Sequence, residues 1–209
     1  MDLGCGPGAT TGLVRATTGA TTTVGIDRPL AFARRARSST GLGFVVADVV
    51  GADLPFADVD LLYARLLLAH LDDPIAVLRR WGEVLAPGGR LLVDDLESID
   101  AEGIFRTYLD EVALAVVRAQ GGSLFVGPVL RAAVDPPRLV RVHDAVVPIA
   151  PRVADTARVF EMNLRVLTER GEVAPEPALG AALAAIARGE RAAPPVRWRF
   201  RQIGWERSG

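Results

Sequence analysis

The stretch Asp2-Leu3-Gly4-Cys5-Gly6-Pro7-Gly8, near the start of the chain, decides the fold. A short strand runs into three closely spaced glycines, and Ala9 to Thr17 beyond them can form a helix. Glycine lets the backbone turn tightly and approach a ligand without a Cβ clash. The free N–H groups at the start of the helix point back at the loop. The stretch indicates a strand–loop–helix unit of the kind that many nucleotide binders use, which makes it a weak signal alone.

The first half of the chain continues this alternation. We expect strands at Thr22–Ile26, Phe44–Ala47, Val59–Tyr63 and Arg90–Val93, helices at Leu30–Arg37 and Ile75–Leu85, and a turn at Pro87-Gly88-Gly89. Strands and helices that alternate at this spacing predict a parallel sheet covered on both faces.

The second half has a different pattern. We expect helices at Ile104–Gln120, at Val153–Leu167 with one apolar stripe, and at Ala178–Arg188. Leu139–Ile149 is rich in strand-forming residues, and Val196–Ile203 alternates apolar residues with arginines, as a half-exposed strand does.

Two acidic residues follow predicted strands. Asp27 ends the second strand, where a carboxylate can accept hydrogen bonds from both hydroxyls of a ribose. Asp48 ends the third, where it can accept a bond from an adenine amino group, with the Val49 backbone beside the ring. Each could instead cap a helix or a turn. A glycine loop and two acids at three successive strand ends favour a ligand site.

Composition removes several classes of function. The 209 residues include 24 arginines and no lysine, so no lysine Schiff base, P-loop lysine or Tyr-Lys dehydrogenase pair exists. The net charge of −1 predicts no bulk attraction to nucleic acid. One cysteine and two histidines allow no internal disulfide and are too few for a convincing metal cluster. We expect no metal, no nucleic-acid partner and no membrane span, and a soluble cytoplasmic protein.

Taken together, these motifs resemble those of the class I S-adenosylmethionine-dependent methyltransferases of the small-molecule type. Residues 2 to about 97 carry the resemblance. The matching stretches are Asp2–Gly8, Gly25–Asp27, Ala47-Asp48 with Asp53–Phe56, Asp60–His70, and Leu85–Leu91 with its Pro-Gly-Gly turn. Residues 139–209 resemble the family more loosely.

The resemblance implies a Rossmann-like α/β fold, doubly wound, with a mostly parallel seven-stranded sheet and helices on both faces. Residues 1–97 would form the core that binds S-adenosyl-L-methionine, and residues 98–209 the substrate-side part of the same domain. The expected reaction is methyl transfer to an O, N or C atom of a small molecule. The composition is typical of a GC-rich genome, and we expect a bacterial protein.

The same resemblance assigns residues to the cofactor. Gly4, Gly6 and Gly8, with Cys5 between them, would line its methionine and adenosine portions, and Asp2 would lie below and help to hold the methionine end. Asp27, followed by Arg28, would hold the ribose, and Asp48 with Val49 the adenine. The backbone near Ala64 and Arg65 would face the methionine end.

The sequence does not identify a catalytic residue. His70 follows the fourth strand and is the one plausible base, but we favour a packing role at a helix start with a bond to the backbone. Asp94, Asp95 and Glu97 form an acidic cluster expected after the fifth strand, more commonly solvated than bound to a basic substrate. Phe105, Tyr108 and Phe125 are aromatic candidates for a substrate wall, and core packing explains them equally well.

Two other interpretations stay open. A nicotinamide-dependent Rossmann dehydrogenase also needs a glycine loop and a distal acid, but Ala9 stands where the third glycine of that loop would be, and the Pro-Gly-Gly turn would be unexplained. The other is a truncated or degenerate methyltransferase homologue, because only Met1 to Leu3 precede Gly4 and strands commonly have about 5–6 residues. On that interpretation we expect a misplaced start site or a fragment.

Overall fold

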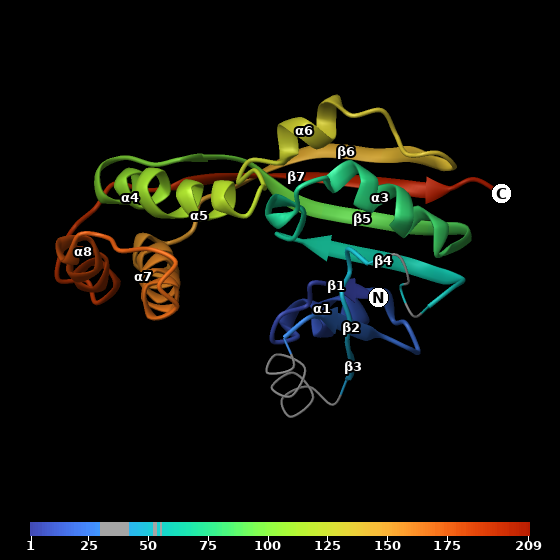
Figure 1. Cartoon of the computed structure of the whole chain (residues 1–209), viewed down its shortest axis with the longest axis horizontal. Coiled ribbons are helices and arrows are strands. Elements are labelled where there is room, and N and C mark those ends of the chain that lie inside the picture. The colour runs from blue at the N-terminus through green and yellow to red at the C-terminus, as the bar shows by residue number, and fades with distance from the viewer. Residues whose placement is uncertain (30–41, 52–53, 55) are drawn as a thin grey trace.

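The computed structural model describes residues 1–29, 42–51, 54 and 56–209, and it is built on one seven-stranded sheet (Figure 1). The strand order is β3-β2-β1-β4-β5-β7-β6. Neighbours from β3 to β5 pair in parallel, and β7 runs antiparallel to both β5 and β6. The predicted mostly parallel sheet is therefore confirmed. The helix expected at 30–37, and residues 53 and 55 of the expected adenine region, lie outside the described residues.

Apart from β5, the strands lie close to where the sequence predicts them. They are β1 (Asp2–Leu3), β2 (Val24–Asp27), β3 (Gly43–Val46), β4 (Val59–Arg65), β5 (Leu85–Asp100), β6 (Leu139–Ile149) and β7 (Arg197–Arg207). The two-residue strand β1 is central, because it pairs with β2 on one side and β4 on the other. Its short length still places the glycine loop at the carboxyl end of the sheet.

Short helical elements connect these strands. They are α1 (Ala9–Thr18), the 3₁₀ turn η1 (Leu68–His70), α3 (Pro74–Glu83), α4 (Gly103–Tyr108), the π-helical turn η2 (Leu109–Ala113), α5 (Leu114–Ala119), α6 (Gly127–Ala132), α7 (Val153–Glu169) and α8 (Pro177–Ala187). The single helix expected at 104–120 is thus interrupted by a π-helical turn. No helix in the described part of the chain has the length and apolar character needed to cross a bilayer.

Strand β5 differs most from the prediction. The turn expected at 87–89 and the short strand expected at 90–93 are parts of one 16-residue strand. Gly88 has a φ of 76°, and a Cβ atom on Gly89 would lie 2.7 Å from the carbonyl oxygen of Val59. Glycines at these two positions let the strand bend while it stays close to β4.

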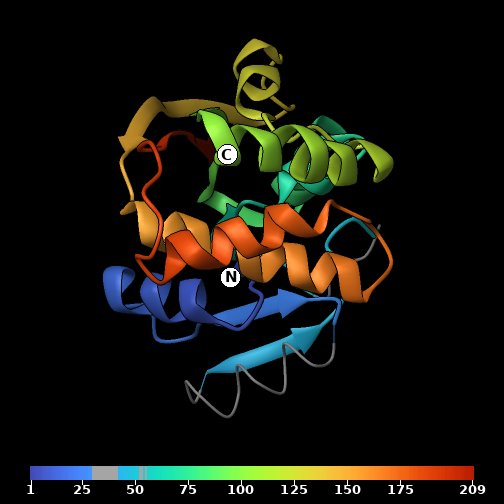
Figure 2. The same cartoon turned by 90° about the vertical axis from the view of Figure 1, so that its left-hand side faces the viewer.

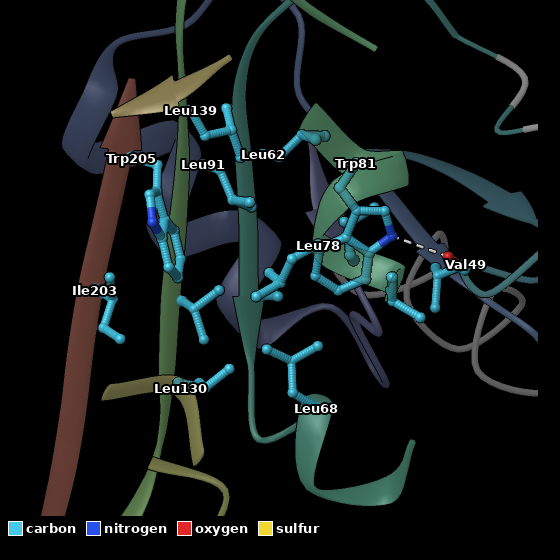
Figure 3. Packing of buried hydrophobic residues seen from close by; sticks show 14 of the residues in the cluster. Val49, Leu62, Leu68, Leu78, Trp81, Leu91, Leu130, Leu139, Ile203 and Trp205 are labelled. Carbon is cyan, nitrogen blue, oxygen red and sulfur yellow. Dashed lines mark hydrogen bonds between the residues drawn. The ribbon is translucent and has the colours of Figure 1, made fainter. Parts of the chain in front are cut away.

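A first apolar core lies between the sheet and the elements that follow β4. It includes Leu62, Leu91 and Ile203 from three strands and Leu78 and Trp81 from α3 (Figure 3). Trp81 and Leu62 are fully buried. This core fixes α3 and η1 against the carboxyl half of β4.

A second apolar core lies beyond the first, around the distal ends of β5 and β7. Helices α7 and α8 pack side by side there (Figures 1 and 2). Its centre is aromatic, because Phe160 stacks on Tyr108 with ring centroids 4.1 Å apart and meets Phe105 edge-on at 5.9 Å. In the described part of the chain, these two large packed centres share β5 and β7, and a small third cluster is formed by Cys5, Leu42 and Phe44.

Candidate functional site

The loop between β1 and α1 has a backbone that glycine adopts readily and other residues do not. Gly4, Gly6 and Gly8 have φ values of 66°, 50° and 89°, all in the left-handed region. A Cβ atom on Gly4 would also lie 2.8 Å from Cδ1 of Leu67, in the segment after β4. The three glycines are therefore explained by conformation, and Gly4 also by close packing.

Asp2 lies below this loop and is almost fully buried. Its Oδ2 accepts hydrogen bonds from the hydroxyls of Thr10 at 2.6 Å and Thr11 at 2.7 Å. Burial raises the pKa of the Asp2 carboxyl, and the two hydroxyl bonds act in the opposite direction. The residue thus ties β1 to the start of α1.

Asp27 is held at the end of β2 by two backbone N–H groups. Its Oδ2 accepts from the amide of Gly6 at 2.7 Å, and its Oδ1 accepts from the amide of Arg28 at 2.8 Å. An ionised carboxylate has about four acceptor positions. Each oxygen therefore keeps acceptor capacity, and the carboxylate is fixed in orientation beside the glycine loop.

The segment after β3 is anchored to α3. Asp48 accepts a bond from the amide of Val50 at 2.9 Å, and Arg28 lies 3.8 Å from its other oxygen. The carbonyl oxygen of Val49 accepts from Nε1 of the buried Trp81 at 2.9 Å (Figure 3). The indole thus fixes the backbone that the sequence predicts to lie beside an adenine ring.

These features surround a cavity of about 1020 Å³ at the carboxyl end of the parallel strands. Open α/β sheets bind ligands at this position, and the volume suits a ligand of nucleoside size. Of the ten residues predicted to bind the cofactor, six line this cavity: Gly4, Gly6, Asp27, Arg28, Asp48 and Val49.

The other four predicted residues do not line the cavity. Asp2 and Gly8 shape the loop from outside it. Cys5 is buried, and burial raises the pKa of its thiol to about 12, so it acts as a packing group. Arg65, predicted to contribute its backbone, is also absent from the lining, and its side chain lies with Nε 3.2 Å from Asp94 and its guanidinium over the Phe200 ring.

Sequence reasoning missed the wall of the cavity formed by α3. Ala76, Val77 and Arg80 line it from one face of that helix. The apolar residues Ile75, Leu78 and Trp81 recur at helical spacing and lie in or against the first core. Residues at 76, 77 and 80 repeat at helical spacing on the neighbouring face, so this signal was present in the sequence.

His70 also lines the cavity, and its environment differs from the predicted one. Its ring is exposed, and Nδ1 lies 3.1 Å from Oε1 of Gln120, a second lining residue. The expected bond from the ring to the backbone is absent among the described contacts of His70. The carbonyl oxygen of Ala69, next to it, accepts a bond from the amide of Ser123 at 3.0 Å, so the segment that follows α5 contacts the η1 turn.

The acidic residues expected after the fifth strand lie within β5 and are largely buried, which corrects the prediction of solvated loop carboxylates. Asp95 is fully buried and accepts bonds from the amides of Leu68 and Leu96, each at 3.0 Å. Burial raises its pKa to about 6. Burial likewise raises the pKa of Asp94, which pairs with Arg65.

Glu97 is also paired. Its Oε2 lies 2.6 Å from Nε of Arg201, and the same guanidinium contacts Asp144 of β6. Arg201 is therefore buried, whereas the alternation in β7 predicted an exposed side chain. Phe105 and Tyr108 lie in the second core and Phe125 packs against it, so packing accounts for the three aromatic candidates.

A protein-family model described as a methyltransferase domain matches residues 1–93. A trans-aconitate 2-methyltransferase of Rhizobium leguminosarum is 37% identical over 94 residues, which is 44% of this chain and 36% of that protein. The chain thus spans less than half the length of that relative.

Solved structures extend the likeness to the whole chain. A Bacillus halodurans protein assigned to the methyltransferases aligns with a TM-score of 0.61 at 14% identity, covering 100% of this chain and 91% of the other. A geranyl diphosphate methyltransferase in complex with S-adenosylmethionine aligns with a TM-score of 0.57 at 17% identity, covering 99% and 76%. Identities this low show the fold alone. The N-terminal sequence thus matches a methyltransferase domain over residues 1–93, and the fold of the chain is that of solved methyltransferases.

Proposed function

We propose that the chain binds S-adenosyl-L-methionine in the cavity at the carboxyl end of the sheet and transfers its methyl group to a small molecule. The observation that carries the proposal is the carboxylate of Asp27, fixed by two backbone N–H groups beside the glycine loop. With acceptor capacity left on both oxygens, it is arranged to accept from two adjacent ribose hydroxyls.

The remaining lining residues are consistent with that placement of the ligand. Asp48 and the backbone of Val49 would hold the adenine, and the loop from Gly4 to Gly6 would leave room for the sulfonium and methionine portions. When bound, the cofactor supplies an activated methyl group. The protein's part is to align the acceptor with it and to exclude water, which can be worth roughly 7–11 kcal/mol of the barrier.

We also propose that the part of the chain after residue 97 supplies the substrate side. Gln120 follows α5 and Arg170 follows α7, and both line the same cavity as Asp27. His70 lies on the same wall as Gln120, with its ring nitrogen held by that side chain. These three polar groups from separate elements are the candidates for contact with the methyl acceptor, whose identity stays open.

Calorimetric titration of the purified chain with S-adenosylhomocysteine, and separately with NAD⁺, tests the proposal. The product analogue is chosen because it has the adenosine and amino-acid portions without a reactive methyl group. We expect saturable binding of S-adenosylhomocysteine at one site per chain and no saturable binding of NAD⁺.

Binding of NAD⁺ alone would refute the proposal and favour the dehydrogenase interpretation. Tight binding of S-adenosylhomocysteine with no methyl transfer from labelled S-adenosylmethionine to any component of a metabolite extract would retain the binding site. That second outcome would favour the degenerate homologue.

A further inference from the structure

Arg80 is a cation in the wall of the cavity, and no described residue forms an ion pair with it. It lies on α3, is half-buried, and lines the cavity together with Ala76 and Val77. Its Nε is shielded from solvent and makes no hydrogen bond, and no ion pair of its guanidinium is present among the described residues. A buried donor without an acceptor costs about 1–3 kcal/mol unless a ligand or water satisfies it.

The other described arginines that are half-buried or buried all have partners within the protein. In the described part of the chain these are Arg65, Arg141, Arg201 and Arg207, and each has an acidic or carbonyl partner within the protein. Arg28 and Arg170, which also line the cavity, are exposed and have acidic neighbours at 3.8 and 3.7 Å. Among the described arginines that are half-buried or buried, Arg80 therefore differs in lining the cavity without an ion pair.

The position of Arg80 along the cavity is set by its neighbour. Trp81 donates to the carbonyl oxygen of Val49, which brings this turn of α3 against the segment that contains Asp48. The base end of the proposed ligand lies there. The edge of an adenine presents an amino donor beside a ring-nitrogen acceptor. A carboxylate that accepts and a guanidinium that donates are the complementary pair for that edge.

We propose that Arg80 is a ligand-binding residue that donates a hydrogen bond to the base of the bound nucleoside and, with Asp48, sets the preference for adenine. The proposal rests on the proposed function, since it needs an adenosine-containing ligand in the cavity. It adds a contact from α3 to the strand-end residues that the sequence predicts.

Calorimetry with two ligands tests this contact. S-adenosylhomocysteine carries the base and an amino-acid carboxylate, whereas 5′-methylthioadenosine carries the base without the carboxylate. We expect Arg80→Met to weaken both ligands by the same factor, roughly tenfold to a hundredfold, which is the range for a lost hydrogen bond from a charged donor. Arg80→Lys keeps the charge without the planar fork, and we expect an intermediate loss.

Arg79→Met is the matched control, because Arg79 is the exposed neighbour on the same helix and does not line the cavity. We expect it to leave both affinities unchanged. Thermal melting of each variant confirms that it is folded before titration.

Two results would overturn the proposal. Wild-type affinity of Arg80→Met for both ligands would remove Arg80 from the site. A loss for S-adenosylhomocysteine alone would place the guanidinium on the amino-acid carboxylate instead of the base. Failure of the proposed function itself gives a different result, because the wild-type chain would then bind neither ligand. That result would also refute the contact between Arg80 and the base.

Discussion

The charged side chains around the two large packed centres differ in whether their partners lie within the protein. Around the second core, the charged groups near β5, β6 and β7 are paired inside the protein, as Arg201 is with Glu97 and Asp144 and Arg65 is with Asp94. Around the cavity beside the first core, Asp27 keeps free acceptor capacity, and Arg80 has no partner among the residues that the structure describes. Polar groups of the first kind hold the fold together, whereas those of the second kind are positioned for something outside the chain.

This contrast predicts a clean separation of effects. Substitutions among the paired charges should lower stability and leave ligand affinity unchanged, and substitutions around the cavity should do the reverse. Three variants test it, from the largest expected effect to the smallest.

Arg201→Met should give the largest loss of stability. It leaves Glu97 and Asp144 without their shared cation, and removing one partner of a buried ion pair costs roughly 3–5 kcal/mol. Urea denaturation measures the free energy of unfolding. Arg197→Met, at an exposed position of the same strand, is the control and should change it little. A loss of under about 1 kcal/mol for Arg201→Met would mean that the network is a minor contribution.

Asp27→Ala should act on the ligand more than on the fold. Losing charge-assisted bonds to a ribose should weaken S-adenosylhomocysteine binding by roughly tenfold to a hundredfold. Calorimetry on the folded variant checks this. Asp72→Asn removes an exposed acid that also lines the cavity, so it controls for a general loss of negative charge. Equal affinities for Asp27→Ala and the wild type would remove Asp27 from the site.

Asp95 lies between the two centres, because it belongs to β5 and bonds to the η1 turn. Its pKa is raised to about 6 by burial, above about 3.9 for an unfolded Asp, so the folded state binds the proton more tightly. The stability that Asp95 contributes therefore rises as the pH falls from 7 through 6 towards 4, by about 1 kcal/mol between pH 7 and pH 5.

Asp95→Asn lacks this titration. The difference between the free energies of unfolding at pH 5 and pH 7 should therefore shift by about 1 kcal/mol relative to the wild type. Urea denaturation at the two pH values gives both quantities. If variant and wild type show the same pH dependence of stability, that dependence belongs to other carboxyls. Asp2 and Asp94 are the candidates, because burial raises their pKa values as well.

The first core was more predictable from sequence than the second. Glycines with positive φ and acids at strand ends are local features, so Gly4, Gly6, Asp27 and Asp48 could be placed at the cavity from their order along the chain. The mostly parallel seven-stranded sheet followed from a resemblance carried by the same residues. Periodicity also predicted α7 closely, since its apolar residues repeat at helical spacing.

What the sequence could not predict depends on contacts between distant residues. The arginine alternation in β7 predicts an exposed strand, but Arg201 is buried because Glu97 and Asp144 reach it from strands on either side. His70 has a side-chain partner 50 residues away, at the end of α5. Arg80 lines the cavity because Trp81 docks its helix turn on the segment after β3.

Strand β5 is a member of both packed centres, since Leu91 and Val93 lie in the first core and Leu96 and Ile99 in the second. The expected boundary at residue 97 falls inside this strand, so a proteolytic cut there would leave neither fragment with a complete central strand. Because the two centres share this strand, we expect them to unfold together. Loss of one centre would release β5 and β7, which also pack in the other, and heating should therefore give a single calorimetric transition whose van't Hoff and calorimetric enthalpies agree.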